Sequence, residues 1–289
     1  MSLLNDSHES SVSIFLQSNK ATRSNSDANK IWLLEEQIKP DPHIQLLVSL
    51  TSLELPYGFY NITTNNNTLV ITNTSTDASS TISIDSKNYS GTQLATELTS
   101  KMAASSITSV IGFTITCSFS DTTNKFTFTS GNTLNNYKID TGTTLLKELG
   151  VRNQLPASSA AGILISPNVC NLSGTSSVYL RVNNLSINNR DSRGNLSGIL
   201  AKINVNANPS EFIFYNAFES IYYGISDRVV SFLDITLTDD DGNELILNGV
   251  DWSLTITMHF QLIKERSIPT KYLLDEIKKL ENEKNKDDK

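Results

Sequence analysis

The acidic turn from Asp239 to Glu244 holds the densest group of side chains that could do chemistry. Its three adjacent aspartates and Asn243 offer the oxygen ligands that Ca²⁺ prefers. A calcium loop places its ligands at alternate positions, whereas these are consecutive, and Asp241-Gly242 is a common turn dipeptide. The spacing therefore favours a polar hairpin turn, with a metal site as the alternative.

Motifs for catalysis are missing from the sequence. It contains no Gly-x-Ser-x-Gly, His-Glu-x-x-His or Cys-x-x-Cys motif and no glycine-rich phosphate loop. The three histidines, His8, His43 and His259, are far apart, so no nucleophile and base are neighbours in sequence. We expect no catalytic residues, no cofactor, no metal and no enzyme; Asp240 and Asp241 are the residues to mutate if hydrolase activity appears.

Aromatic side chains could instead stack on a sugar. Trp252 lies on the apolar side of an alternating segment, which favours packing in a core. A carbohydrate- or receptor-binding β-sandwich would need exposed aromatics on a polar face. The candidates are Tyr57, Tyr60, Tyr222 and Tyr223.

Charge and cysteine content narrow the function classes further. The net charge is −7, and the tail from Lys271 to Lys289 is neutral, so the deficit belongs to the body. An acidic body without clustered lysine and arginine is a poor nucleic-acid binder. Cys117 and Cys170 have apolar neighbours, which indicates buried free thiols and a reducing compartment. We expect no signal peptide, since residues 1–11 are polar, and no membrane span.

The sequence predicts mainly short β-strands as the elements that position these residues. From Val250 to Leu262, apolar and polar residues alternate without a break over 13 positions, which predicts a long, half-buried final strand. Asn248-Gly249 precedes it, a strong hairpin signal, and Leu245 to Leu247 is the expected partner strand. Serine-, threonine- and asparagine-rich turns separate further alternating segments. The fold class predicted is therefore all-β.

Residues 78–155 differ from the rest of the sequence because their patterns predict helices as well as strands. Ser90 to Gln93 is a capping box that opens a helix, and a short helix from Thr144 to Leu149 is expected to end at Gly150. The β texture returns after a linker of small residues. These changes predict a flexible arm (1–11), a discontinuous β domain (12–77 and 156–265), an inserted α+β subdomain (78–155) and a helical tail (266–289) with an apolar stripe of Leu273, Ile277 and Leu280.

Several segments together resemble the penton, or vertex, capsid proteins of virophages, Polinton-like viruses and related large double-stranded DNA viruses. The first segment joins a strand to a proline and aromatic residues, the second is a strand pair, and the third is the most specific. They are Leu53 to Ile62, Ile199 to Val205 with Phe212 to Tyr215, and Asp239 to Asn243 continuing through Leu247 to Leu254.

This resemblance implies a single jelly-roll β-sandwich in the capsid of an icosahedral virion, assembled inside the host cell. It implies a homopentamer that fills each vertex beside trimers of a double jelly-roll major capsid protein. The inserted subdomain would face outward, toward a host surface or a fibre, and the arm and tail would reach neighbouring proteins. A minor capsid or cement protein of the same virus class is the alternative, beside the carbohydrate-binding sandwich.

Overall fold

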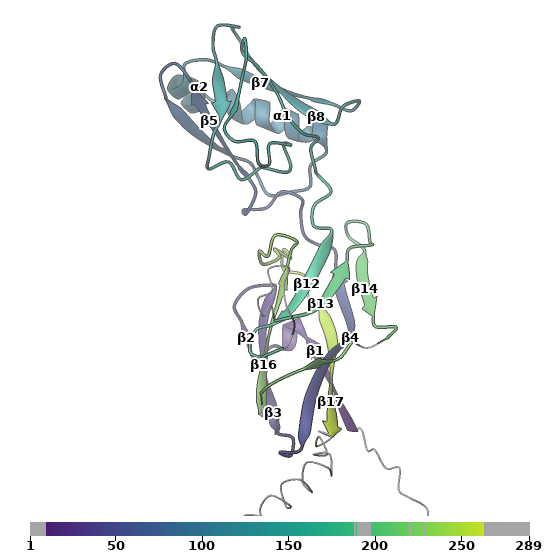
Figure 1. Ribbon diagram of the computed structural model, residues 1–289. Coiled ribbons are helices and arrows are strands. Elements are labelled where there is room, and N and C mark those ends of the chain that lie inside the picture. Colours follow the sequence, from purple (N-terminus) through teal and green to yellow (C-terminus); the bar gives the residue numbers. More distant parts are fainter. Residues whose placement is uncertain (1–9, 188, 190–197, 220, 228, 263–289) are drawn as a thin grey trace, which may run out of the picture.

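The computed structural model describes residues 10–187, 189, 198–219, 221–227 and 229–262. Two units lie end to end along one long axis (Figure 1). The first holds both ends of the described chain, and the second is reached and left through two adjacent crossings. The two units have separate hydrophobic cores with no residue in common.

The first unit is a sandwich of two antiparallel sheets, which we call sheet A and sheet B. Sheet A has the order β1-β17-β4-β14, with β15 also on β4. Its strands are β1 (Ser10–Gln17), β4 (Ile44–Pro56), β14 (Phe212–Asn216), β15 (Tyr223–Gly224) and β17 (Ser253–Leu262). A 3₁₀ turn, η1 (Ser18–Lys20), follows β1.

Sheet B has the order β13-β12-β16-β3-β2. Its strands are β2 (Arg23–Ser24), β3 (Asn29–Ile38), β12 (Ser177–Val182), β13 (Ile199–Asn204) and β16 (Val230–Thr238). The chain thus passes between two facing five-stranded sheets, which is the arrangement of a jelly roll. The predicted all-β jelly-roll fold is confirmed.

Alternating side chains from both sheets fill the first core. Leu233, Ile235 and Leu237 of β16 are fully buried, and the two tryptophans of the chain, Trp32 and Trp252, meet edge to face with ring centroids 5.7 Å apart. Such alternation places one face of each strand inward and the other outward.

The final strand is shorter and less regular than the sequence predicted. β17 begins at Ser253, three residues after Val250, and its register on β4 shifts between Thr255 and Ile256. The shift leaves one extra residue, Thr51, in β4. Leu254, Ile256 and Met258 of β17 still alternate on the buried side.

Asn248-Gly249 forms the expected tight turn but no hairpin. Both residues have positive φ, 55° and 80°, as a type I′ turn requires. The partner predicted at Leu245 to Leu247 is not a strand; Leu245 N–H donates instead to Leu237 O at 3.0 Å. The turn therefore closes a loop between β16 and β17.

The second unit contains the two described helices and two small sheets, of order β10-β9-β5-β6 and β11-β8-β7. The helices are α1 (Gly91–Met102) and α2 (Ser105–Ile111). The strands are β5 (Thr68–Asn73), β6 (Ser79–Ser83), β7 (Ile115–Ser120), β8 (Lys125–Ser130), β9 (Tyr137–Ile139), β10 (Ala157–Ser158) and β11 (Ile163–Ile165). The capping box predicted at Ser90 to Gln93 is confirmed at the start of α1.

The limits of the second unit differ from those that composition predicted. Its core extends from Ile62 to Leu164, with Leu172 packed against it, beyond the predicted limits of 78 and 155. β5 lies inside it because it pairs with β6 and β9, and β11 because it pairs with β8. The pairing of strands determines which residues belong to the second unit, and this pairing cannot be read from the composition of the sequence.

The first strand begins inside the segment predicted to be a flexible arm. The arm was predicted to end at residue 11, but β1 begins at Ser10, where Ser10 pairs with Phe260. The arm is therefore at least two residues shorter than predicted. The predicted helical tail at 266–289 lies outside the described residues.

The short helix predicted at Thr144 to Leu149 is a series of turns. Leu145 and Leu149 are nevertheless fully buried, and Leu149 N–H donates to Leu145 O at 3.3 Å, so a hydrogen bond of helical spacing is present although no helix forms. Gly150 does adopt a positive φ of 70°, as a glycine that closes a turn often does.

We predict that Gly150→Ala destabilises the second unit by about 2–3 kcal/mol, because it combines left-handed strain with a clash. A Cβ on Gly150 would run into the carbonyl of Asn168. Gly112→Ala is the matched control, since Gly112 has φ +86° but nothing within 4 Å of the added carbon. Denaturant unfolding of both variants checks the difference; equal losses would contradict the steric argument.

Candidate functional site: the junction between the units and the outer face of sheet A

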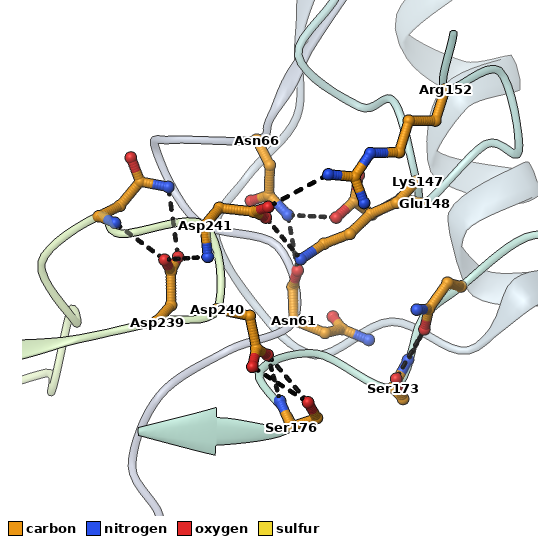
Figure 2. A network of polar contacts seen from close by, with 12 residues as sticks. Asn61, Asn66, Lys147, Glu148, Arg152, Ser173, Ser176, Asp239, Asp240 and Asp241 are labelled. Atoms are coloured by element: carbon orange, nitrogen blue, oxygen red, sulfur yellow. Dashed lines mark hydrogen bonds and ion pairs between the residues drawn. The ribbon is translucent and has the colours of Figure 1, made fainter. Parts of the chain in front are cut away.

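The acidic turn lies where the two units meet, and its carboxylates point in different directions (Figure 2). Asp239 Oδ1 accepts hydrogen bonds from the backbone N–H of Asp241 at 2.9 Å and of Asn243 at 2.8 Å. Asp239 therefore holds the turn itself in shape, in the manner of an Asx turn.

The next two carboxylates reach away from the turn. Asp240 accepts from the backbone N–H of Ser176 at 2.8 Å and from its hydroxyl, at the start of β12. Asp241 accepts from Lys147 Nζ at 3.2 Å and Arg152 Nη2 at 3.4 Å, both on the second unit. The turn thus links the jelly roll to the second unit.

This arrangement uses the acidic side chains as separate acceptors. Within the described part of the chain, no group of three or more histidine, cysteine, aspartate or glutamate side chains is placed to hold a metal ion. The two ion pairs of Asp241 are partly exposed, so each contributes little to stability. The two ion pairs therefore orient the second unit against the jelly roll more than they stabilise the contact between them.

The three segments that carry the sequence resemblance meet at this end of the jelly roll. Asn248 Nδ2 donates to Gly58 O at 2.6 Å, which joins the third segment to the first. Tyr57 N–H donates to Glu211 O at 2.8 Å, directly before Phe212 of the second. Segments that are far apart in sequence are therefore adjacent at the end of the jelly roll beside the second unit.

Glu148 is the most buried charged side chain at the junction, with 1% of its surface exposed. Its Oε1 accepts from Asn66 Nδ2 at 2.7 Å, while Oε2 is buried and has no described partner. Burial raises the pKa of Glu148, since a charged carboxylate is poorly solvated there; the Asn66 hydrogen bond opposes this. Sequence reasoning missed Glu148, because nothing in its local pattern marks it as buried.

We predict that Glu148→Gln stabilises the second unit by about 1 kcal/mol at neutral pH. An acid whose pKa is raised by folding is neutral in both states at low pH, and the folded state loses stability as pH rises above the ordinary glutamate value. Unfolding followed from pH 4 to pH 8 should show this decline in the wild type and its absence in Glu148→Gln.

Glu211→Gln provides a control of opposite sign. Hydrogen bonds from Asn208 lower the pKa of Glu211, so its contribution is lost as pH falls. A Glu148→Gln variant with the wild-type pH dependence would contradict the burial argument.

A pocket of about 300 Å³ opens at the junction and is lined by both units. Tyr60 lines it, together with Asn65, Arg152 and the acidic turn. The other tyrosines proposed for sugar stacking lie elsewhere: Tyr57 packs on Phe59, Tyr222 on His259, and Tyr223 pairs with Val48 in sheet A. The four tyrosines do not share one polar face.

The remaining residues singled out from sequence are dispersed. His43 is exposed in a turn before β4, and His8 lies outside the described residues. Cys117 is buried, and this raises the pKa of its thiol, whereas Cys170 is only half-buried. Both thiols are free, and they lie in the second unit.

The outer face of sheet A is almost free of charge, exposed along its two edges and partly buried along its middle. Glu54 is the only aspartate, glutamate, lysine or arginine in its five strands. Serine and threonine hydroxyls run down the middle of the face; Thr257 Oγ1, for example, lies 3.2 Å from Ser13 Oγ and 2.7 Å from Thr51 Oγ1.

Exposed phenylalanines flank this row of hydroxyls. Phe15 on β1 is 79% exposed, and Phe212 and Phe214 on β14 are 53% and 59% exposed with their rings stacked 5.8 Å apart. Few charges and exposed aromatic rings are the composition of an interface core. The sequence analysis did not identify this face, because Phe212, Ile213 and Phe214 form a continuous apolar run that does not show which side chains are exposed.

No protein-family model and no curated protein matches the chain. Among solved structures, the chain is similar to the crystal structure of the penton protein of mavirus, over 88% of this chain and 99% of that one, with 14% identity and a TM-score of 0.43. The sequence predicted a resemblance to virophage penton proteins, and the structural comparison also finds one. No helix in the described ranges is long and apolar enough to cross a membrane.

Proposed function

We propose that the protein is a structural capsid protein that forms the vertex of an icosahedral double-stranded DNA virus as a ring of five copies. The single observation that carries the proposal is the outer face of sheet A, which is nearly uncharged and flanked by exposed phenylalanines. A water-facing surface of this composition is suited to burial against another protein.

The two ends of the molecule support the proposal. The second unit covers one end of the jelly roll, and Ser10 pairs with Phe260 near the other (Figure 1). We infer that the second unit faces outward, toward a host surface or a fibre. The neighbouring capsid proteins in this proposal are double jelly-roll trimers.

The mechanism is geometric and needs no catalytic group. Five identical wedges close around an axis when each presents two different surfaces to its two neighbours. The resembling segments support this placement, since they are adjacent at the end beside the second unit.

Negative-stain imaging of the purified full-length protein tests the proposal. At high protein concentration, class averages should show five-sided rings or caps. Averages with threefold symmetry, or single particles under every assembly condition, would contradict a vertex role. A particle map that places the protein between capsomers would support the cement alternative.

A further inference from the structure

We propose that the outer face of sheet A in one copy binds the outer face of sheet B in the next, with Glu54 of the first facing Lys202 of the second. The inference rests on the proposed ring of five copies and names its contact.

Glu54 is an exposed carboxylate without an opposite charge. Leu53 and Leu55 point into the core, so Glu54 points outward. Its row in the sheet contains Ser253 and Phe214, and its contact there is Ser253 Oγ at 3.4 Å. Glu54 forms no ion pair with any residue that the structure describes. Asp251 lines the same hollow as Glu54, so the charge at this end of the face is negative and favours a partner of opposite sign.

Sheet B presents the opposite charge next to an aromatic ring. Lys202 on β13 is exposed and pairs with Tyr179 on β12, with Nζ 5.8 Å from the ring centroid. Among the described ion pairs, none includes Lys202. Arg181, two residues along the same side of β12, adds a second cation at the face.

The two groups lie at the same level along the molecule. Glu54 is two residues before the end of β4, from which the chain enters the second unit. Tyr179, beside Lys202, is two residues after the start of β12, where the chain returns. When two copies are related by rotation about an axis parallel to the strands, Glu54 of one copy and Lys202 of the next therefore lie at the same height.

Contact between two copies of the sheet A face fits less well. It would bring two uncharged faces together with Glu54 facing its own counterpart, and like charges oppose such a pairing. It would also use one surface on both partners, which closes a dimer and cannot make a ring of five. Charge complementarity therefore favours the outer face of sheet B of a second copy as the partner of the outer face of sheet A.

Charge reversal in the full-length protein tests the contact. We expect Glu54→Lys and Lys202→Glu each to raise the protein concentration needed for half-maximal ring formation at least about tenfold, since each puts like charges together. The double variant should return to within about threefold of the wild type. Sedimentation velocity over a concentration series measures this, and circular dichroism confirms that each variant is folded.

Glu36→Lys and Lys39→Glu form the matched control pair, because both residues are exposed at the other end of sheet B's edge. This pair should leave ring formation unchanged. Rings of five that form equally well in all variants would overturn the contact while leaving the proposed function in place. A wild type that forms no rings would overturn both.

Discussion

Replacing Trp252 with alanine is expected to lower the free energy of unfolding of the jelly roll by about 3–5 kcal/mol. The indole is 3% exposed and packs edge to face on Trp32. Its Nε1 donates to Asp27 O at 3.0 Å, so the substitution leaves a cavity and also removes the hydrogen bond to that carbonyl.

Trp252→Phe is the graded control. It keeps an apolar ring in the core and loses the indole N–H, so its cost should be much smaller, about 1–2 kcal/mol. Chemical denaturation followed by circular dichroism measures both. A Trp252→Ala protein as stable as the wild type would contradict the placement of this side chain in the core.

Replacing Phe128 with alanine is expected to lower the stability of the second unit by about 3–5 kcal/mol and to leave the jelly roll unchanged. Phe128 is fully buried in β8, between Cys117 of β7 and Leu164 of β11. The two cores share no residue, and partly exposed polar contacts contribute much of the junction, so little energetic coupling is expected.

The chain carries its own separate reporters for this experiment. Both tryptophans lie in the jelly roll, so intrinsic tryptophan fluorescence follows that unit alone. Both cysteines lie in the second unit, and Cys117 becomes reactive only when that core opens. Thiol labelling against denaturant should therefore shift in Phe128→Ala while the fluorescence transition stays in place. Equal shifts in both signals would show one cooperative unit.

Local sequence patterns predicted the strands better than their partners. Alternation located β12 and β16 well, because one face of each is buried and the other is not. The bulge at Thr51 of β4 was not predictable, since it depends on pairing with β17, which is far away in the sequence. The limits of the second unit failed for the same reason, as strand pairing draws β5 and β11 into it.

The candidate site was predicted in part. Asp239, Asp240 and Asp241 were recognised as a polar turn, but their partners Ser176, Lys147 and Arg152 come together only through the fold. Glu54 carried no signal of its own. Its significance depends on the absence of charge from four other strands that are distant in sequence but adjacent in sheet A.

The mass of the assembled full-length protein tests the central claim most directly. Native mass spectrometry across protein concentration and salt should give a dominant species at five times the 31.8-kDa chain mass. A closed ring predicts that intermediates of two to four copies remain minor. A protein that stays monomeric, or that assembles only as trimers, under all of these conditions would contradict the proposal that it forms a fivefold capsid vertex.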